Sequence, residues 1–406
     1  MIRCRRAGVD PRPPYGGSGS PSAVTPSASN APNVHATITD PNGATLVSSP
    51  THAAAAPDGA TRASSFRLRE RWMLVGSSLW LVTGLQLDSY AHATIPDLET
   101  FWTPWHGVLY SGIAACGFVL LWLLRPRLPA VITYRNLLTH TPPALRLPVV
   151  GMGMLLVGGG IDTLWHNLFG IEKGLEIFTS PSHYLIIGGM VLVAAGPALM
   201  LAAAPVRTLR GNDAVLVTVS ALLAVIPLHI YTQHASSLSH PRLGTGDNPM
   251  RTFSLDGQML HGYFGSTVLL LLPILLIGRR WPLPVGMPTI LVALPALLLS
   301  VMFSDPGEGW LPITVALAAA VVELLARASL RWTRTLRSDT QWLLLGFFSP
   351  VVLWGSVFAV GRVIVGVGWG LHTMSGVLTF AALSGLGTAY VLRRIQPASE
   401  ELPTAS

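Results

Sequence analysis

Long apolar stretches, each near the length needed to cross a lipid bilayer, recur from Trp72 almost to the end of this 406-residue chain. A helix needs about 20 residues to span roughly 30 Å of hydrocarbon, because each residue adds about 1.5 Å. We therefore predict an all-α, polytopic membrane bundle of about ten transmembrane helices, arranged as five hairpins with internal repeats. The expected spans are residues 72–92, 104–124, 147–169, 182–204, 213–235, 258–278, 285–304, 309–330, 340–362 and 368–392.

The composition of the chain divides it into a membrane domain and two tails. Only 11% of the residues are charged, whereas about a quarter are charged in an ordinary soluble domain. Residues 1–65 are rich in Pro, Ser and Ala without an apolar period, which predicts a disordered cytoplasmic tail. The transmembrane domain is then 66–396, followed by a short cytoplasmic tail over 397–406. Within it we expect repeat one at 72–124, repeat two at 147–204, and degenerate hairpins at 213–278, 285–330 and 340–392.

The positive charges are distributed unequally between the two sides of the expected bundle. Of the 26 Lys and Arg residues, 22 fall in the tails and in the connections on the same side as the tails. The positive-inside rule then places both termini in the cytoplasm, in a multi-pass protein of the plasma or inner membrane. The basic pI of about 9.9 is accordingly explained by topology, and we expect the lipid bilayer as a partner and no nucleic acid.

A polar motif occurs twice on the opposite side, where each of the first two hairpins turns. Each copy contains Asp-x3-His, then Glu-x-Phe-x-[Ser/Thr]-Pro-x-His. The Asp-x3-His elements are 74 residues apart and the later elements 77, so this is an internal repeat with a three-residue insertion. We call the two sets of residues the first triad and the second triad. The first triad is Asp88, His92 and His106, and the second is Asp162, His166 and His183.

The spacing within each motif brings one carboxylate and two imidazoles together. Asp and His four residues apart share one helix face, so both side chains can reach the same ion. Thr103 and Ser180 are good N-cap residues, and the prolines that follow them suit the first helical position. His106 and His183 then lie on the first turn of the returning helix, close to the Asp-His pair. Two imidazoles with a carboxylate suit copper, zinc or iron.

Other polar residues near the same side are candidates for additional ligands or for orienting the imidazoles. Glu99 and Glu176 accompany the two triads. The third and fifth hairpins contribute His234, His261, His372 and Arg362 in weaker copies of the pattern, for which plain interfacial hydrogen bonding is equally consistent. Glu323 lies four residues before Arg327, which favours an ion pair over a proton path. Capping alone explains the Ser/Thr-Pro elements, but it does not explain the repeated acids and histidines.

The duplicated motif resembles that of the C subunit of the particulate methane and ammonia monooxygenases. That family has Asp-x3-His on a membrane helix and a later His introduced by Phe-Thr-Pro-Ser-His, and these ligands hold copper. Phe101, Thr103 and Pro104 match the later element in one copy, and Phe178, Ser180 and Pro181 in the other. The match covers about two hairpins of five. This chain departs from the family pattern in three ways. The later element has one extra residue in each copy, and the two histidines of each copy are farther apart in sequence. The motif also occurs twice in this chain. The resemblance implies a copper site in the membrane.

Three functions are consistent with this pattern. One is a copper-dependent membrane oxidoreductase acting on a small or apolar molecule, with other membrane subunits as possible partners. Another is a metal transporter or copper-handling protein, which predicts a polar path inward with Glu323 as its obvious candidate. A third is a haem-binding membrane protein, in which the carboxylates are dispensable. A duplicated scaffold whose polar residues only bond to one another is the structural alternative.

Overall fold

The computed structural model describes residues 66–95, 103–128, 133–170, 172, 174–239, 249–304, 307–332, 339–366 and 368–394. Throughout these ranges the regular structure is helical and includes no strand, as the apolar pattern predicts. The predicted tails, 1–65 and 397–406, lie outside the described residues. The transmembrane domain is described from Phe66 to Arg394.

The first half of the membrane domain consists of two helical hairpins and their connections. Helix α2 (Leu68–Thr94) pairs with α3 (Pro104–Leu124), and α5 (Pro143–Phe169) pairs with α6 (Pro181–Ala194). The short helices η1 (Arg125–Arg127) and α4 (Tyr134–His140) connect the hairpins, and η2 (Gly174–Phe178) connects α5 to α6. The expected span 182–204 is interrupted at Ala195, after which the chain continues as α7 (Gly196–Ala202).

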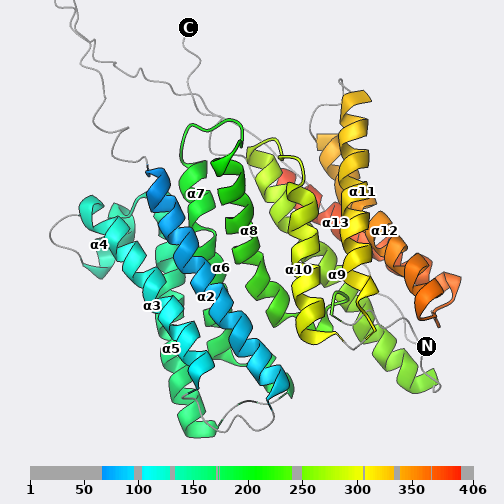
Figure 1. The fold of residues 1–406 in the computed structure, drawn as a ribbon, viewed down its shortest axis with the longest axis horizontal. Helices are drawn as coiled ribbons and strands as arrows, with labels where there is room; N and C mark the ends of the chain where they lie inside the picture. The colour runs from blue at the N-terminus through cyan, green and yellow to red at the C-terminus, as the bar shows by residue number, and fades with distance from the viewer. Residues whose placement is uncertain are drawn as a thin grey trace, which may run out of the picture. The chain divides into compact units, whose positions relative to one another are not determined.

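The second half contains the remaining long helices. They are α8 (Asn212–Tyr231), the short η3 (Gln233–Ala235), α9 (Pro249–Arg280), α10 (Met287–Phe303), α11 (Trp310–Trp332), α12 (Asp339–Ile364) and α13 (Leu371–Arg393). In sequence, α10 and α11 form one hairpin and α12 and α13 another, and both pairs are in contact. Figure 1 shows this half beside the half formed by α2–α7.

Eight helices in the described residues are long and apolar enough to cross a membrane, so the chain is a multi-pass membrane protein. All ten expected spans fall on helices, but two of those helices differ from the eight. Helix α2 is 27 residues long and carries Arg69, Glu70, Arg71 and Asp88, which lower its mean hydropathy. Helix α10 is apolar but only 17 residues long, and is thus shorter than a typical span.

Glycines allow close packing within both hairpins of the repeat. A Cβ atom on Gly84 would lie 2.7 Å from the Cα of Leu109, and one on Gly112 would lie 2.6 Å from the Cα of Leu81. Gly158 and Gly189 occupy the corresponding positions, 74 and 77 residues later, where a Cβ atom would lie 2.9 Å and 2.6 Å from the nearest atom of the facing helix. Small residues at such positions let membrane helices approach closely. The repeat thus extends from the polar motif to the helix packing that supports it.

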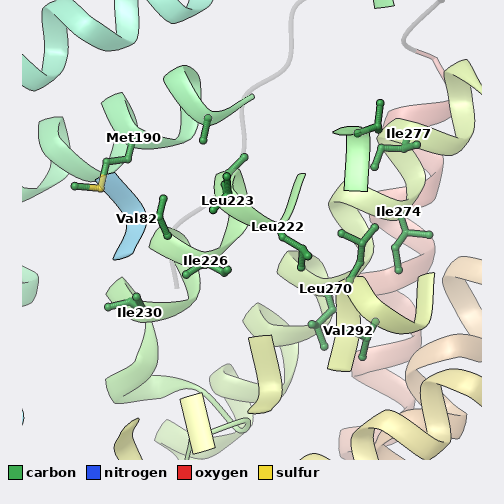
Figure 2. Packing of buried hydrophobic residues seen from close by; sticks show 14 of the residues in the cluster. Val82, Met190, Leu222, Leu223, Ile226, Ile230, Leu270, Ile274, Ile277 and Val292 are labelled. Atoms are coloured by element: carbon green, nitrogen blue, oxygen red, sulfur yellow. The ribbon is translucent and has the colours of Figure 1, made fainter. Parts of the chain in front are cut away.

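Helix α8 joins the two halves of the membrane domain. It contacts α2 and α6 on one side and α9 and α10 on the other. Figure 2 shows Val82 of α2 and Met190 of α6 near Leu223 and Ile226, while Leu222 lies toward Leu270 and Val292. These side chains are buried in one continuous apolar core. Burial of this kind fixes α8 against the first half, and its C-terminal residues Ile230 and Tyr231 also line the cavity described below.

The two ends of the bundle differ in chemistry. Both triads lie where α2 and α5 end and where α3 and α6 begin, at one end of the bundle. Arg127 and Arg279 lie at the opposite helix ends. At that same end Glu323 accepts hydrogen bonds from the backbone of Gly286 at 2.7 Å and from Arg327 Nη2 at 2.6 Å. The predicted ion pair between Glu323 and Arg327 is therefore confirmed, and the carboxylate also caps the start of α10.

Candidate metal centre

The first triad converges as the helical spacing predicts. Asp88 and His92 lie one turn apart near the end of α2, and His106 lies in the first turn of α3. The His92 Nε2 is 3.9 Å from one carboxylate oxygen of Asp88, and the His106 Nε2 is 3.7 Å from the other. The three potential ligand atoms all lie within 4.8 Å of one another. Asp88 and His106 are buried, and His92 is partly buried.

The second triad has the same arrangement with shorter separations. The Nε2 atoms of His166 and His183 lie 3.5 Å and 3.2 Å from the same oxygen of Asp162, Oδ1. The potential ligand atoms again lie within 4.8 Å of one another. Asp162 is only 3% exposed, which makes it the more deeply buried of the two triad aspartates. The duplicated sequence motif thus produces two matching clusters.

Local helix-start structure positions the later histidine of each triad differently. Thr103 caps α3, where its hydroxyl accepts from the backbone N–H of His106 at 3.2 Å and lies 2.9 Å from the imidazole Nδ1. Ser180 was expected to cap α6 in the same way, but its side chain does not accept from the helix backbone. Its hydroxyl instead lies 2.8 Å from the hydroxyl of Ser182.

Hydrogen bonds fix which nitrogen is available on the two imidazoles of the second triad. His183 Nδ1 lies 2.7 Å from the carbonyl oxygen of Ile177, and His166 Nδ1 lies 3.3 Å from that of Gly170. A carbonyl oxygen can only accept, so each Nδ1 carries a hydrogen and donates it. In the neutral imidazole the Nε2 lone pair then faces the Asp162 carboxylate. Two electron-rich atoms at this distance require a proton or a cation between them, and metal-bound histidines commonly have this pattern.

Asp162 has two hydroxyl donors that the sequence motif did not identify. Tyr110 of α3 donates to Oδ2 at 3.0 Å, and Ser182 donates to Oδ1 at 3.0 Å. Tyr110 belongs to the first hairpin, so it connects the two copies of the repeat. Its ring packs over Gly159, where a Cβ atom would lie 2.9 Å from the ring. Gly159, like Gly158, thus allows close packing against a neighbouring helix.

Both triads line one cavity of about 300 Å³. The His106 and His166 rings, which belong to different triads, are 6.3 Å apart between centroids. This separation is similar to the 6.2 Å between His166 and His183 within the second triad. The rest of the wall is largely apolar and comes from several helices. It includes Leu85, Leu109, Ile177, Phe178, Ile186, Ile187, Ile230 and Phe303.

An additional carboxylate, Glu172, lies in this cavity. Its Oε2 is 3.5 Å from His166 Nε2 and 3.9 Å from His183 Nε2. Glu172 is 9% exposed, and neither carboxylate oxygen has a hydrogen-bond partner. Gly170 ends α5 with a φ of 86°, a value that favours glycine, and Glu172 lies two residues later. The repeat did not identify Glu172 because the three-residue insertion falls in this loop, and the corresponding loop of the first copy, which contains Asp97, lies outside the described residues.

The two predicted glutamates are placed differently. Glu176 is exposed in η2 and does not line the cavity of the triads, although it shares a neighbouring pocket with Glu172. Glu99 lies outside the described residues. The sequence pattern therefore pointed to an acidic residue in the right loop, but the structure brings Glu172 rather than Glu176 to the histidines.

The remaining predicted residues do not join the triads. His234 is exposed, and its ring lies 4.3 Å from that of Phe178 between centroids. His261, His372 and Arg362 are exposed and do not line the cavity. The weaker third and fifth copies of the pattern thus place His234 against Phe178 and leave the other polar side chains exposed, away from the triads. These copies lack the Asp that lies one helical turn before the His in the first two copies.

The residues present fit a cation. Asp88 Oδ1 is buried without a hydrogen-bond partner, as are both oxygens of Glu172. A buried carboxylate without a compensating partner is costly, and such groups are usually paired or coordinate metals. Imidazole nitrogens and carboxylate oxygens are the donors expected for zinc, iron or copper. Two groups of residues in the described structure therefore have the composition and geometry to hold metal ions.

Comparisons of the chain with protein-family profiles, with characterised proteins and with solved structures found no match.

Proposed function

We propose that this membrane protein binds transition metal, with copper favoured, through the first and second triads. The observation that carries the proposal is the convergence of each Asp-His-His set within 4.8 Å. Interfacial hydrogen bonding alone does not account for buried carboxylate oxygens that lack donors. The donor set is also compatible with zinc or iron. Copper is favoured by the motif-level resemblance to the C subunit of the particulate monooxygenases.

The metal centre is proposed to lie at the extracytoplasmic side of the plasma or inner membrane. This orientation follows from the excess of Lys and Arg in the tails and in the connections at the opposite end of the bundle. Both termini are then cytoplasmic. The metal would then be supplied from outside the cell or from the periplasm.

The most specific version of the proposal is a copper-dependent oxidoreductase acting on a small or apolar molecule. The cavity is small, and its wall beyond the ligands is mainly aliphatic and aromatic. A bound copper ion would supply redox and Lewis-acid chemistry. The chain's own residues would hold the imidazoles through Gly170 and Ile177, orient Asp162 through Tyr110, and exclude water with the apolar wall.

The two alternatives are less well supported. A transporter needs a polar path inward, and its expected component, Glu323, is held by Arg327 and Thr289 and lines a different cavity. A haem protein needs an imidazole nitrogen directed at an iron. All four triad imidazoles instead direct Nε2 toward an aspartate.

The metal content of the detergent-purified, full-length protein tests the proposal. Wild-type protein grown with sufficient copper should contain stoichiometric metal, and His166→Ala should lose most of it. His372→Ala is the matched control, because His372 is exposed and outside the cavity. An absence of stoichiometric metal in the wild type would contradict the proposal, and a strong Soret band would favour the haem alternative.

A further inference from the structure

The distance between the triads is close to the distances within them. The His106 and His166 rings are 6.3 Å apart, compared with 5.5 Å for His92 and His106 of the first triad. Both triads line the same cavity. Ions held by the two triads would therefore interact directly rather than occupy independent sites.

The number of ligands exceeds what one ion takes. Four imidazoles and the carboxylates of Asp88, Asp162 and Glu172 line the cavity. A zinc or copper ion in a protein commonly takes about four protein ligands. Seven donors are consistent with two ions that also leave positions open for a small molecule.

The charge in the cavity leads to the same conclusion. Among the described residues that line it, the three carboxylates are accompanied by no Lys or Arg. One divalent ion would leave a net negative charge in a largely apolar surrounding, which is unfavourable. Two divalent ions more than neutralise the carboxylates, and the excess positive charge would attract a hydroxide or an anionic group of a substrate.

Glu172 is the residue that distinguishes this centre from two simple copies of one motif. Its carboxylate is nine-tenths buried, lacks hydrogen-bond donors, and lies 3.5 Å and 3.9 Å from the Nε2 atoms of His166 and His183. It also lines a neighbouring pocket, which the cavity's other carboxylates do not line. We propose that the two triads form one dinuclear metal centre in which Glu172 is the seventh protein ligand. This inference rests on the proposed metal binding.

The experiment is a Cu(II) titration of metal-free, full-length protein in detergent. Bound copper per chain is measured after gel filtration, and the number of unpaired spins is measured by EPR on the same samples. Wild-type protein should bind two copper ions per chain and give fewer spins than bound copper, because two close Cu(II) ions couple. Glu172→Gln should lower the affinity for one of the two copper ions by at least about tenfold, which is the usual effect of removing a residue that holds or orients a metal ligand. Glu176→Gln should behave as wild type, because Glu176 does not line the cavity.

Each other outcome contradicts a defined part of the inference. One copper per chain, or two copper ions with two independent spins, would exclude a dinuclear centre while leaving metal binding intact. Equal effects of Glu172→Gln and Glu176→Gln, or no effect of either, would remove Glu172 from the ligand set. No bound copper in the wild type would contradict the proposed function itself. The wild-type result decides the dinuclear question even if a variant fails to fold.

Discussion

Asp162 and Asp88 occupy equivalent positions in the repeat but have different surroundings. Asp162 accepts hydrogen bonds from Tyr110 and Ser182, whereas Asp88 Oδ1 is buried without a donor. The imidazoles of the second triad are also held by backbone carbonyl oxygens. A carboxylate and imidazoles that are already oriented bind metal more tightly, because less ordering is required on binding. We therefore expect the second triad to bind the first equivalent of metal.

The hydroxyl of Tyr110 provides a test of this asymmetry. Tyr110→Phe removes the donor to Asp162 Oδ2 and keeps the ring that packs over Gly159. We predict that the affinity for the first metal ion falls by about 10- to 100-fold, the usual effect of losing a group that orients a ligand. Affinity is measured by competition with a chelator. Tyr90→Phe is the control, because Tyr90 is exposed on α2 and does not line the cavity. Equal affinities for wild type and Tyr110→Phe would show that this hydrogen bond does not orient the centre.

The order in which the two triads bind copper gives a separate prediction. With one equivalent of Cu(II), His183→Ala should lower the bound fraction strongly, whereas His92→Ala should have little effect. Each residue is partly exposed and each belongs to one triad, so the two variants are closely matched. Bound copper after gel filtration is the measurement. The reverse order of effects would place the tighter site at the first triad.

The sequence was sufficient to identify the six triad residues because their spacing is regular and occurs twice. It did not identify Tyr110 or Ser182, because each is present in one copy only, and it did not identify Glu172, because the loop after His166 differs in length from the loop after His92. Tyr110 reaches Asp162 across a contact between hairpins, 52 residues away in sequence, and such a contact depends on how the helices pack. Glu172 depends on the backbone conformation at Gly170, which spacing alone does not specify.

The helices of each repeat pack through glycines at equivalent positions. Gly112→Ala would place a Cβ 2.6 Å from the Cα of Leu81, so α2 and α3 would have to separate. We predict a loss of about 1–3 kcal/mol in stability, typical of overpacking, together with weaker metal binding because Asp88 and His106 lie on the two helices. Thermal unfolding in detergent is the measurement. Gly76→Ala is the control, since a Cβ there has no neighbour within 4 Å, and it should be neutral or slightly stabilising. Equal melting temperatures for the two variants would contradict the packing account.

The length of the apolar stretches predicted where the helices lie, but it did not predict several of the residues at which they begin or end. The break at Ala195 lies within an apolar stretch, and Gly196 and Pro197 follow it. Helix α9 starts at Pro249, well before the expected span 258–278 and before the apolar stretch that begins at Leu260. Apolar length therefore predicts the presence of a helix better than the residue at which it ends.

At the scale of the whole molecule, the two ends of the bundle should face different compartments. Thr179 is exposed beside the metal centre, and Thr208 is exposed between α7 and α8 at the other end. With Cys4 replaced by Ser and Cys116 buried, a cysteine at position 179 should react with an impermeant thiol reagent in intact cells. A cysteine at position 208 should react only after permeabilisation. Reaction of Thr208→Cys alone in intact cells would reverse the orientation.

The central claim is that metal ions bind in the cavity shared by the two triads. Anomalous diffraction from crystals of copper-loaded, full-length protein, collected on both sides of the copper absorption edge, tests it most directly. The account predicts two anomalous peaks in this cavity, one beside Asp88, His92 and His106 and one beside Asp162, His166 and His183. Copper-loaded crystals with no peak in the cavity, or with peaks only at other residues, would contradict it.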